Sequence, residues 1–299
     1  MTRASILVPS HNRPNTLALA VGSALAQTVG DLEVIIIGDG VTAEVRTAAQ
    51  RLASDDARVV FLDLPKGEHH GETHRDTAIR TARSDAIFYL CDDDLLLPDH
   101  VADLLHLLES GHTFVQSLNG YVDRKGGIHR IGGSLFDPEA VAWLLRDDLR
   151  YNFVSITGTA HSKRFYLDLD RPWSTTPPGE WPDLHQWRKM VGRPGFSGAT
   201  SARMTALQFP ASQPEREGWR ESDQLEELQR WAEFVRLPGA QEKVDLLVAR
   251  GTELALTETT RDLIAAVGSL HELERLHVDL MNTVSWRITR PLRALRRRF

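Results

Sequence analysis

Short apolar runs alternate with helical spacing over the first 115 residues. Unbroken apolar or β-branched runs, typical of strands covered on both faces, occur at residues 5–8, 32–37, 59–62 and 86–90. Between them, apolar side chains recur every three or four residues, which predicts helices at 15–28, 43–53, 73–83 and after Pro98. This alternation predicts an α/β domain built on a mostly parallel sheet with helices on both faces.

The pattern is less regular in the middle of the chain and becomes helical near its end. Further strands are expected at residues 113–117, 128–131 and 153–157, and helices are expected from Asp137 and over 183–191. Residues 171–182 are rich in Pro and Trp, which predicts an ordered loop. From about residue 213 long helical patterns dominate, with expected breaks at Pro238-Gly239 and Gly251. We therefore expect one domain over residues 1–212, with halves of about 1–115 and 116–212, and a helical region over 213–299.

Composition narrows the class of protein. The single cysteine, Cys91, excludes an intramolecular disulfide, so we expect a reducing, cytoplasmic setting. No window approaches the roughly 18 apolar residues of a membrane-spanning helix. The net charge is −6, yet residues 286–299 contain six arginines and no acidic residue. The rest of the chain is therefore strongly acidic, which argues against nucleic acid as a partner.

An acidic triplet, Asp92-Asp93-Asp94, directly follows an apolar strand. Adjacent carboxylates repel one another, and a divalent cation removes that conflict. Mg²⁺ or Mn²⁺ held by one or two carboxylates and by phosphate oxygens is common at nucleotide sites. In open parallel sheets, ligands bind beyond the carboxyl ends of strands, where this triplet is expected. A solvated acidic loop that caps the next helix explains the triplet alone about as well.

Two other strand ends carry polar groups. Asp39 lies between Gly38 and Gly40, where a carboxylate could accept a hydrogen bond from a nucleobase, although Gly-Asp-Gly alone is also ordinary turn chemistry. The segment from Pro9 to Arg13 follows the first strand. The chain contains neither G-x-G-x-x-G nor G-x-x-x-x-G-K-[ST], which disfavours a dinucleotide-binding fold and a P-loop NTPase.

Together these motifs, with Gly71, Arg75 and Pro98, resemble in order and spacing the family 2 glycosyltransferases of the GT-A fold. The resemblance covers residues 4–110 well and 150–195 less well. It implies a GT-A fold, a UDP-, GDP- or dTDP-linked sugar as donor, and Mg²⁺ or Mn²⁺ as cofactor. The donor contacts that it implies are Pro9, Ser10, His11, Asn12, Arg13, Asp39, Gly40, Gly71, Arg75 and Asp92.

Within the triplet, the resemblance places Asp92 on the ribose and Asp93 on the metal, with Asp94 as a further metal ligand. The register of the three carboxylates stays open. The sequence departs from the family at two positions. Gly38 stands where many members have a first aspartate, and Asp76 replaces a common asparagine.

An inverting transferase also needs a base that removes the proton of the acceptor hydroxyl. In the family this base begins a helix some 80–100 residues past the metal motif. Asp183 has that place, and Glu180 is the second candidate. An ordinary helix-capping carboxylate explains Asp183 equally well. The nearby tryptophans 173, 181 and 187 could form an acceptor wall or pack in the core.

A histidine cluster at residues 69, 70 and 74 has no H-E-x-x-H spacing and no neighbouring cysteine, so loop histidines are expected and not a zinc site. The segment 285–293 resembles an ending common in bacterial surface-polysaccharide transferases. Such a basic amphipathic tail could rest on anionic lipid at the inner face of a membrane, which would suit a lipid-linked glycan acceptor. A solvated tail, or one docked on the acidic body, is the alternative.

We therefore expect a metal-dependent, inverting glycosyltransferase that acts on a glycan or a lipid-linked glycan. The helical region could also join two copies of the chain. A nucleotidyltransferase is the nearest alternative enzyme, but it would want a Gly- and Lys/Arg-rich loop after the first strand, and residues 9–14 contain no glycine. A non-catalytic assembly protein acting through its helical region is the alternative from another class.

Overall fold

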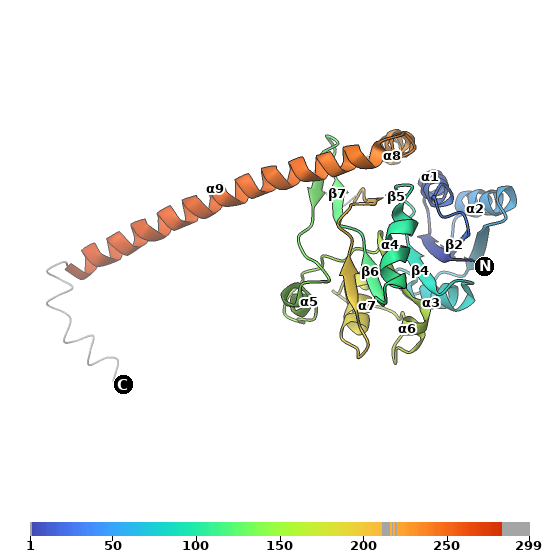
Figure 1. Cartoon of the computed structure of the whole chain (residues 1–299), viewed down its shortest axis with the longest axis horizontal. Coiled ribbons are helices and arrows are strands. Elements are labelled where there is room, and N and C mark those ends of the chain that lie inside the picture. Colours follow the sequence, from blue (N-terminus) through green and yellow to red (C-terminus); the bar gives the residue numbers. More distant parts are fainter. Residues whose placement is uncertain (1, 211–215, 217, 219, 283–299) are drawn as a thin grey trace. The chain divides into compact units, whose positions relative to one another are not determined.

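The computed structural model describes residues 2–210, 216, 218 and 220–282. Two compact units, residues 1–249 and 250–299, make up the chain. The first contains a seven-stranded sheet of order β10-β6-β9-β4-β1-β2-β3, in which β9 is antiparallel to β4 and β6 and the other neighbours are parallel (Figure 1). The strands are β1 (Ala4–Ser10), β2 (Leu32–Asp39), β3 (Val59–Leu64), β4 (Ala86–Tyr89), β6 (Phe114–Gln116), β9 (Thr159–Ser162) and β10 (Gly198–Thr200). The predicted, mostly parallel sheet is confirmed.

Helices cover both faces of this sheet because its central strands bury alternate side chains on opposite sides. One face, with Ile6 of β1, packs on α1 (Pro14–Leu25), α2 (Ala43–Asp55) and α4 (His100–Glu109). The other face, with Leu7, packs on α3 (Glu72–Thr81), α5 (Pro138–Leu144), α6 (Lys163–Leu167) and α7 (Pro182–Val191). The first four strands of the chain, β1 to β4, and the helices between them follow the predicted order.

Two smaller sheets complete this unit. β5 (Leu95–Leu96) pairs with β11 (Ala206–Leu207), and β7 (Gly120–Val122) pairs with β8 (Ile128–Arg130). A third buried cluster joins them to α8 (Glu221–Phe234) and to the start of α9 (Ala240–Asn282). Residues 221–249 therefore pack within the first compact unit. The division at residue 212, drawn from the change of pattern, stays a prediction.

Two expectations about secondary structure are wrong. Residues 153–157 form no strand, since the carbonyl groups of Phe153 and Val154 accept hydrogen bonds from side chains and not from a neighbouring strand. Gly251 does not interrupt α9, because one glycine inside a helix costs only about 1 kcal/mol. Gly239, in contrast, has φ +75° and separates α8 from α9 as expected.

In the second unit the structure describes residues 250–282, all of them in α9. Every side chain from 253 to 281 is exposed. Within the described part of the chain, no helix has the length and apolar character needed to span a membrane. The arginine-rich tail, residues 286–299, lies outside the described residues.

Candidate active site

The carboxyl ends of the parallel strands β1, β2, β3 and β4 lie at one edge of the sheet, and the segments that follow them line a cavity of about 480 Å³. Its walls are Pro9, Ser10, His11, Asn12, Arg13, Asp39, Lys66, His69, His70, Arg75, Cys91, Asp92 and Asp93. Most of the predicted donor contacts are therefore brought together. Gly40 and Gly71 are not part of this wall, and Asp183 and Glu180 lie outside it.

Asp39 is held in a network that the sequence pattern did not indicate. Its Oδ2 accepts a hydrogen bond from Lys66 Nζ at 2.5 Å, and its Oδ1 accepts one from the backbone N–H of Gly67 at 2.6 Å. His74 Nε2 lies 3.4 Å from the same Oδ1. Burial opposes ionisation, but Lys66 and Gly67 outweigh it and hold the pKa of Asp39 below its usual value. The carboxylate at the end of β2 is therefore ionised at neutral pH.

Gly71 makes room for this carboxylate. It adopts φ +61° before α3, and a Cβ built there would lie 2.4 Å from Asp39 Cγ. Any larger side chain would displace Asp39, so the conformation of this carboxylate depends on a residue from a distant part of the sequence. The adjacency of β2 and β3 could have indicated Lys66, because the carboxyl ends of parallel neighbours meet at one edge.

The acidic triplet occupies the turn between β4 and β5. Asp92 Oδ2 accepts from Ser10 Oγ at 2.7 Å, and the guanidinium of Arg13 pairs with Asp93 and lies 3.9 Å from Asp92. Burial raises the pKa of Asp92, while Ser10 and Arg13 oppose that effect. The sequence predicts that a divalent cation neutralises the acidic triplet. In the structure, Arg13 neutralises part of that negative charge.

Asp94 faces inward from the same turn. Its Oδ2 accepts from Thr157 Oγ1 at 2.6 Å and its Oδ1 from the backbone N–H of Phe209 at 2.9 Å. Only 6 % of the residue is exposed, and burial raises the pKa of its carboxyl to about 6. Asp94 therefore fastens the turn to two distant segments.

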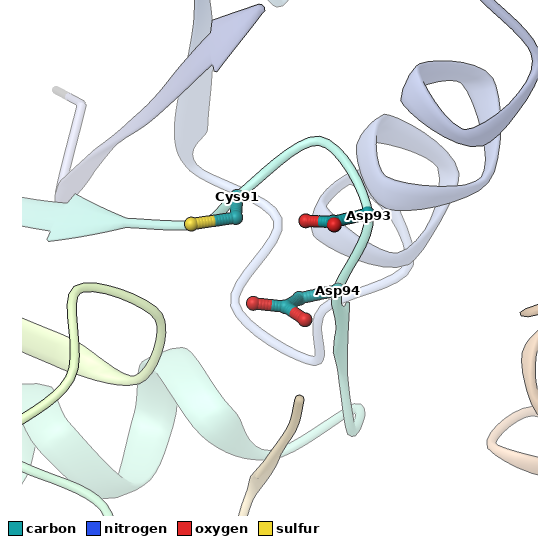
Figure 2. A group of neighbouring side chains, drawn as sticks. All are labelled: Cys91, Asp93 and Asp94. Atoms are coloured by element: carbon teal, nitrogen blue, oxygen red, sulfur yellow. The ribbon is translucent and has the colours of Figure 1, made fainter. Parts of the chain in front are cut away.

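Cys91, Asp93 and Asp94 form a group that could hold a metal ion, with one ligand atom of each within 4.8 Å of the others (Figure 2). Burial raises the pKa of the Cys91 thiol, so it stays protonated and offers no thiolate. The two carboxylates fit Mg²⁺ or Mn²⁺, which prefer oxygen ligands and are often completed by phosphate oxygens. The donor set thus suits these cations better than zinc.

Arg75 is a buried cation that lacks a full set of partners. It is 8 % exposed and lies over the ring of Trp173, with Cζ 5.0 Å from the ring centroid. Among the described residues its Nε has no hydrogen-bond partner, and its Nη1 lies 3.5 Å from the carbonyl oxygen of His70. Burial lowers the pKa of Arg75, yet a guanidinium stays charged at neutral pH. An anionic ligand in the cavity would satisfy it.

Buried hydrogen bonds fix Trp173 beneath Arg75. Its Nε1 donates to Tyr89 Oη at 3.0 Å, and Tyr89 in turn donates to His161 Nε2 at 2.8 Å. His161 Nδ1 then donates to the carbonyl oxygen of Ser162 at 3.0 Å. Burial lowers the pKa of His161 to about 4, which keeps the ring neutral. This chain of contacts joins β4 and β9 to the wall of the cavity.

Of the three tryptophans considered for an acceptor wall, two are core residues. Trp187 and Trp173 are 0 % and 3 % exposed, whereas Trp181, at the N-terminus of α7, is 45 % exposed. Trp181, two residues before Asp183, is therefore the one of the three that is exposed to solvent.

Asp183 lies in the first turn of α7. Burial raises the pKa of its carboxyl, opposed by hydrogen bonds from Leu184 and Asn152 and by the charge of Arg75. Glu180 is more exposed, and its Oε2 lies 2.8 Å from His185 Nδ1. Asp183 is thus electrostatically coupled to Arg75, a residue of the cavity wall, whereas Glu180 pairs with a histidine of the helix that follows it.

Comparison with known families gives one match. Residues 5–157, about half of the chain, match the family described as glycosyl transferase family 2. A GalNAc(5)-diNAcBac-PP-undecaprenol beta-1,3-glucosyltransferase of Campylobacter jejuni is 25 % identical over 130 residues, which are 44 % of this chain and 42 % of that enzyme. The chain thus matches less than half the length of that relative.

Two solved structures share the fold. The Staphylococcus aureus TarS 1–349 structure superposes with a TM-score of 0.54 at 13 % identity, covering 84 % of this chain and 70 % of that chain. A mannosyltransferase of Pyrobaculum calidifontis in complex with GDP-Man and Mn²⁺ gives 0.52 at 17 % identity, over 98 % of this chain and 84 % of that one. The expected GT-A fold is confirmed.

Proposed function

Because the chain belongs to glycosyl transferase family 2, we propose that it transfers a sugar from a nucleotide-diphosphate donor to a hydroxyl of a glycan, with inversion and with a divalent metal. The observation that carries the proposal is the cavity itself. It combines the ionised Asp39 with the under-partnered Arg75 and with the carboxylates of the acidic turn.

Each part of the donor has a matching group. Asp39 would accept a hydrogen bond from an N–H of the base, and Asp92 would accept from a ribose hydroxyl. The buried guanidinium of Arg75, helped by Arg13, would bind the diphosphate, since guanidinium nitrogens form charge-assisted hydrogen bonds with phosphate oxygens. Pro9 and the polar residues 10–12 would line the base and the ribose. Gly71 lets the backbone lie close to Asp39, and Gly40 lets it lie close to Lys66, the partner of Asp39.

Asp93 and Asp94 would hold Mg²⁺ or Mn²⁺. Such an ion neutralises the diphosphate charge and stabilises the leaving group. The Pyrobaculum calidifontis enzyme, which shares the fold, is described with Mn²⁺ and GDP-Man, which supports this proposal. Arg13, which pairs with Asp93, lies at the same edge of the cavity and would contact the phosphates of the donor.

Asp183 would act as the base. The acceptor hydroxyl would give its proton to the Asp183 carboxylate, and its oxygen would bond to the anomeric carbon as the bond from that carbon to the diphosphate breaks. The nucleoside diphosphate would leave on the opposite face of the sugar. Burial, which raises the pKa of Asp183, makes its carboxylate a better proton acceptor. Glu180 is the reserve candidate.

The acceptor would be a lipid-linked glycan. The Campylobacter jejuni relative is named for an undecaprenol-diphosphate-linked acceptor. The exposed ring of Trp181 would stack on an acceptor sugar beside Asp183. We further propose a cytoplasmic protein whose arginine-rich tail contacts the inner face of the membrane.

Nucleotide binding and turnover test the proposal separately. Thermal stabilisation of the wild type by UDP, GDP and dTDP, with and without Mn²⁺, identifies the nucleobase of the donor. Hydrolysis of a panel of sugar nucleotides then identifies the sugar. Asp93→Ala should abolish the metal-dependent part of nucleotide binding. Asp183→Asn should keep binding and lose at least about a hundredfold in kcat, as removal of a general base does.

Two results would contradict the proposal at different points. A wild type that is stabilised by none of the three nucleotides would favour an assembly protein over a transferase. An Asp183→Asn variant with wild-type kcat would leave the transferase in place and show that the base is another residue.

A further inference from the structure

Asp183 accepts one of its hydrogen bonds from a distant segment. Its Oδ1 accepts from the backbone N–H of Leu184 at 2.8 Å, within its own helix. Its Oδ2 accepts from Asn152 Nδ2 at 2.9 Å. Asn152 lies between α5 and β9. It directly precedes residues 153–157, for which the sequence predicted a strand. The carboxylate thus has a partner that no motif in the sequence indicates.

The orientation of the Asn152 amide follows from its partners. Its Oδ1 accepts from the backbone N–H of Val154 at 3.0 Å. A flipped amide would place its NH₂ group against that N–H and its oxygen against the carboxylate of Asp183, so both contacts would become repulsive. The N–H of Asn152 is therefore directed at Asp183.

Hydrogen bonds from Asn119 and Trp187 hold the Asn152 segment independently of Asp183. The carbonyl oxygen of Phe153 accepts from Asn119 Nδ2 at 2.8 Å, and that of Val154 accepts from Trp187 Nε1 at 2.8 Å. Trp187 is fully buried and belongs to α7, the helix that carries Asp183. The helix and the Asn152 segment are therefore joined independently of the Asn152–Asp183 contact.

We propose that Asn152 is a positioning residue that fixes the rotamer of the Asp183 carboxylate and stabilises its ionised form for proton abstraction. This inference rests on the proposed role of Asp183 as the base. An N–H donated to a carboxylate favours the charged form, since the neutral acid accepts more weakly. Burial pushes the pKa of Asp183 upward, and Asn152 counteracts that effect.

Two substitutions in the full chain separate this role from a purely structural one. Asn152→Ala removes both contacts of the amide. Asn152→Asp keeps an acceptor for the Val154 N–H but sets a carboxylate against Asp183. Assays use the sugar nucleotide hydrolysed by the wild type and a synthetic polyprenyl-diphosphate-linked sugar as acceptor. We expect kcat to fall at least about tenfold in Asn152→Ala and further in Asn152→Asp.

The pH dependence of activity distinguishes a positioning role of Asn152 from a structural one. The base must be ionised, so activity rises with pH on the acidic limb, and loss of the Asn152 N–H should move that limb about one pH unit higher. The KM for the donor should not change. If Asn152 only held the loop in place, the order of kcat in the two variants would be reversed. Asn152→Asp would then have a kcat close to that of the wild type, and Asn152→Ala would have a lower one.

A matched control lies three residues away. Ser155 Oγ contacts Asn119 and the carbonyl oxygen of Thr157, with no contact to Asp183, so Ser155→Ala should keep the wild-type pH profile. Unshifted acidic limbs in both Asn152 variants, with Asp183→Asn inactive, would overturn the role of Asn152 and leave the proposed function intact. An active Asp183→Asn variant would overturn the base and this inference together.

Discussion

At the scale of single residues, the cavity depends on close contacts between groups that lie far apart in the sequence. Asp39 is ionised because Lys66 and Gly67 outweigh its burial, and it fits only because position 71 has no side chain. The loop that follows the neighbouring strand β3 therefore fixes the charge and position of an aspartate whose own Gly-Asp-Gly sequence indicates only a turn.

Gly71→Ala tests this contact. The new Cβ would lie 2.4 Å from Asp39 Cγ, so the carboxylate must move, and we expect affinity for the nucleoside diphosphate to fall at least about tenfold. Isothermal titration with the nucleotide that best stabilises the wild type measures the loss. The control is Gly195→Ala, where φ is +85° but no atom lies within 4 Å of the added Cβ. Equal affinities for the two variants would contradict a donor contact at Asp39.

At the scale of elements, the sequence predicted the first four strands because each is an unbroken apolar run, and the helices between them because their apolar side chains recur every three or four residues. Site residues at strand ends, such as Asp39, followed from that alternation, since the carboxyl ends of parallel strands meet. Lys66 and Asn152 come from irregular loops, whose positions depend on tertiary contacts that no period records. The segment 153–157 shows the same limit, because its apolar residues face the core while its carbonyl groups bond to side chains.

The β4–β9 pair predicts a dependence of stability on pH. Burial lowers the pKa of His161 to about 4, whereas its value in the unfolded chain is about 6.5. Between pH 6.5 and 4, His161 therefore binds a proton in the unfolded chain but not in the folded one. Stability is therefore lost as pH falls from about 6.5 to 4, at on the order of 1 kcal/mol per pH unit. His161→Gln is less stable than the wild type at pH 7.5, because it breaks the contact with Tyr89.

Urea unfolding at pH 7.5 and 5.0 measures this effect. Since a glutamine side chain does not titrate, the gap in unfolding free energy between the wild type and His161→Gln should narrow at pH 5.0. The exposed His106→Gln variant controls for the loss of a histidine and should show no narrowing. A gap that is equal or wider at pH 5.0 would show that His161 is protonated in the folded protein.

At the scale of the whole molecule, the two units differ in whether their apolar side chains are buried. The first buries its apolar side chains on both faces of a sheet and has the cavity lined by Asp39 and Arg75 at one edge. The second, as far as it is described, exposes leucines at 256, 263 and 270, seven residues apart, with Val267 between the last two. A helix with that spacing buries its apolar stripe by pairing with another helix.

We propose that the partner of this stripe is the same helix in a second copy of the chain, because a heptad spacing is self-complementary. Light scattering on the full chain should then give about twice 33.5 kDa. Leu263→Glu combined with Leu270→Glu should give the monomer mass, since four carboxylates would face one another in the seam. Leu254→Glu, equally exposed but outside the seven-residue repeat, should keep the dimer. A monomeric wild type, or a dimer that survives the double substitution, would contradict pairing of two copies through this stripe.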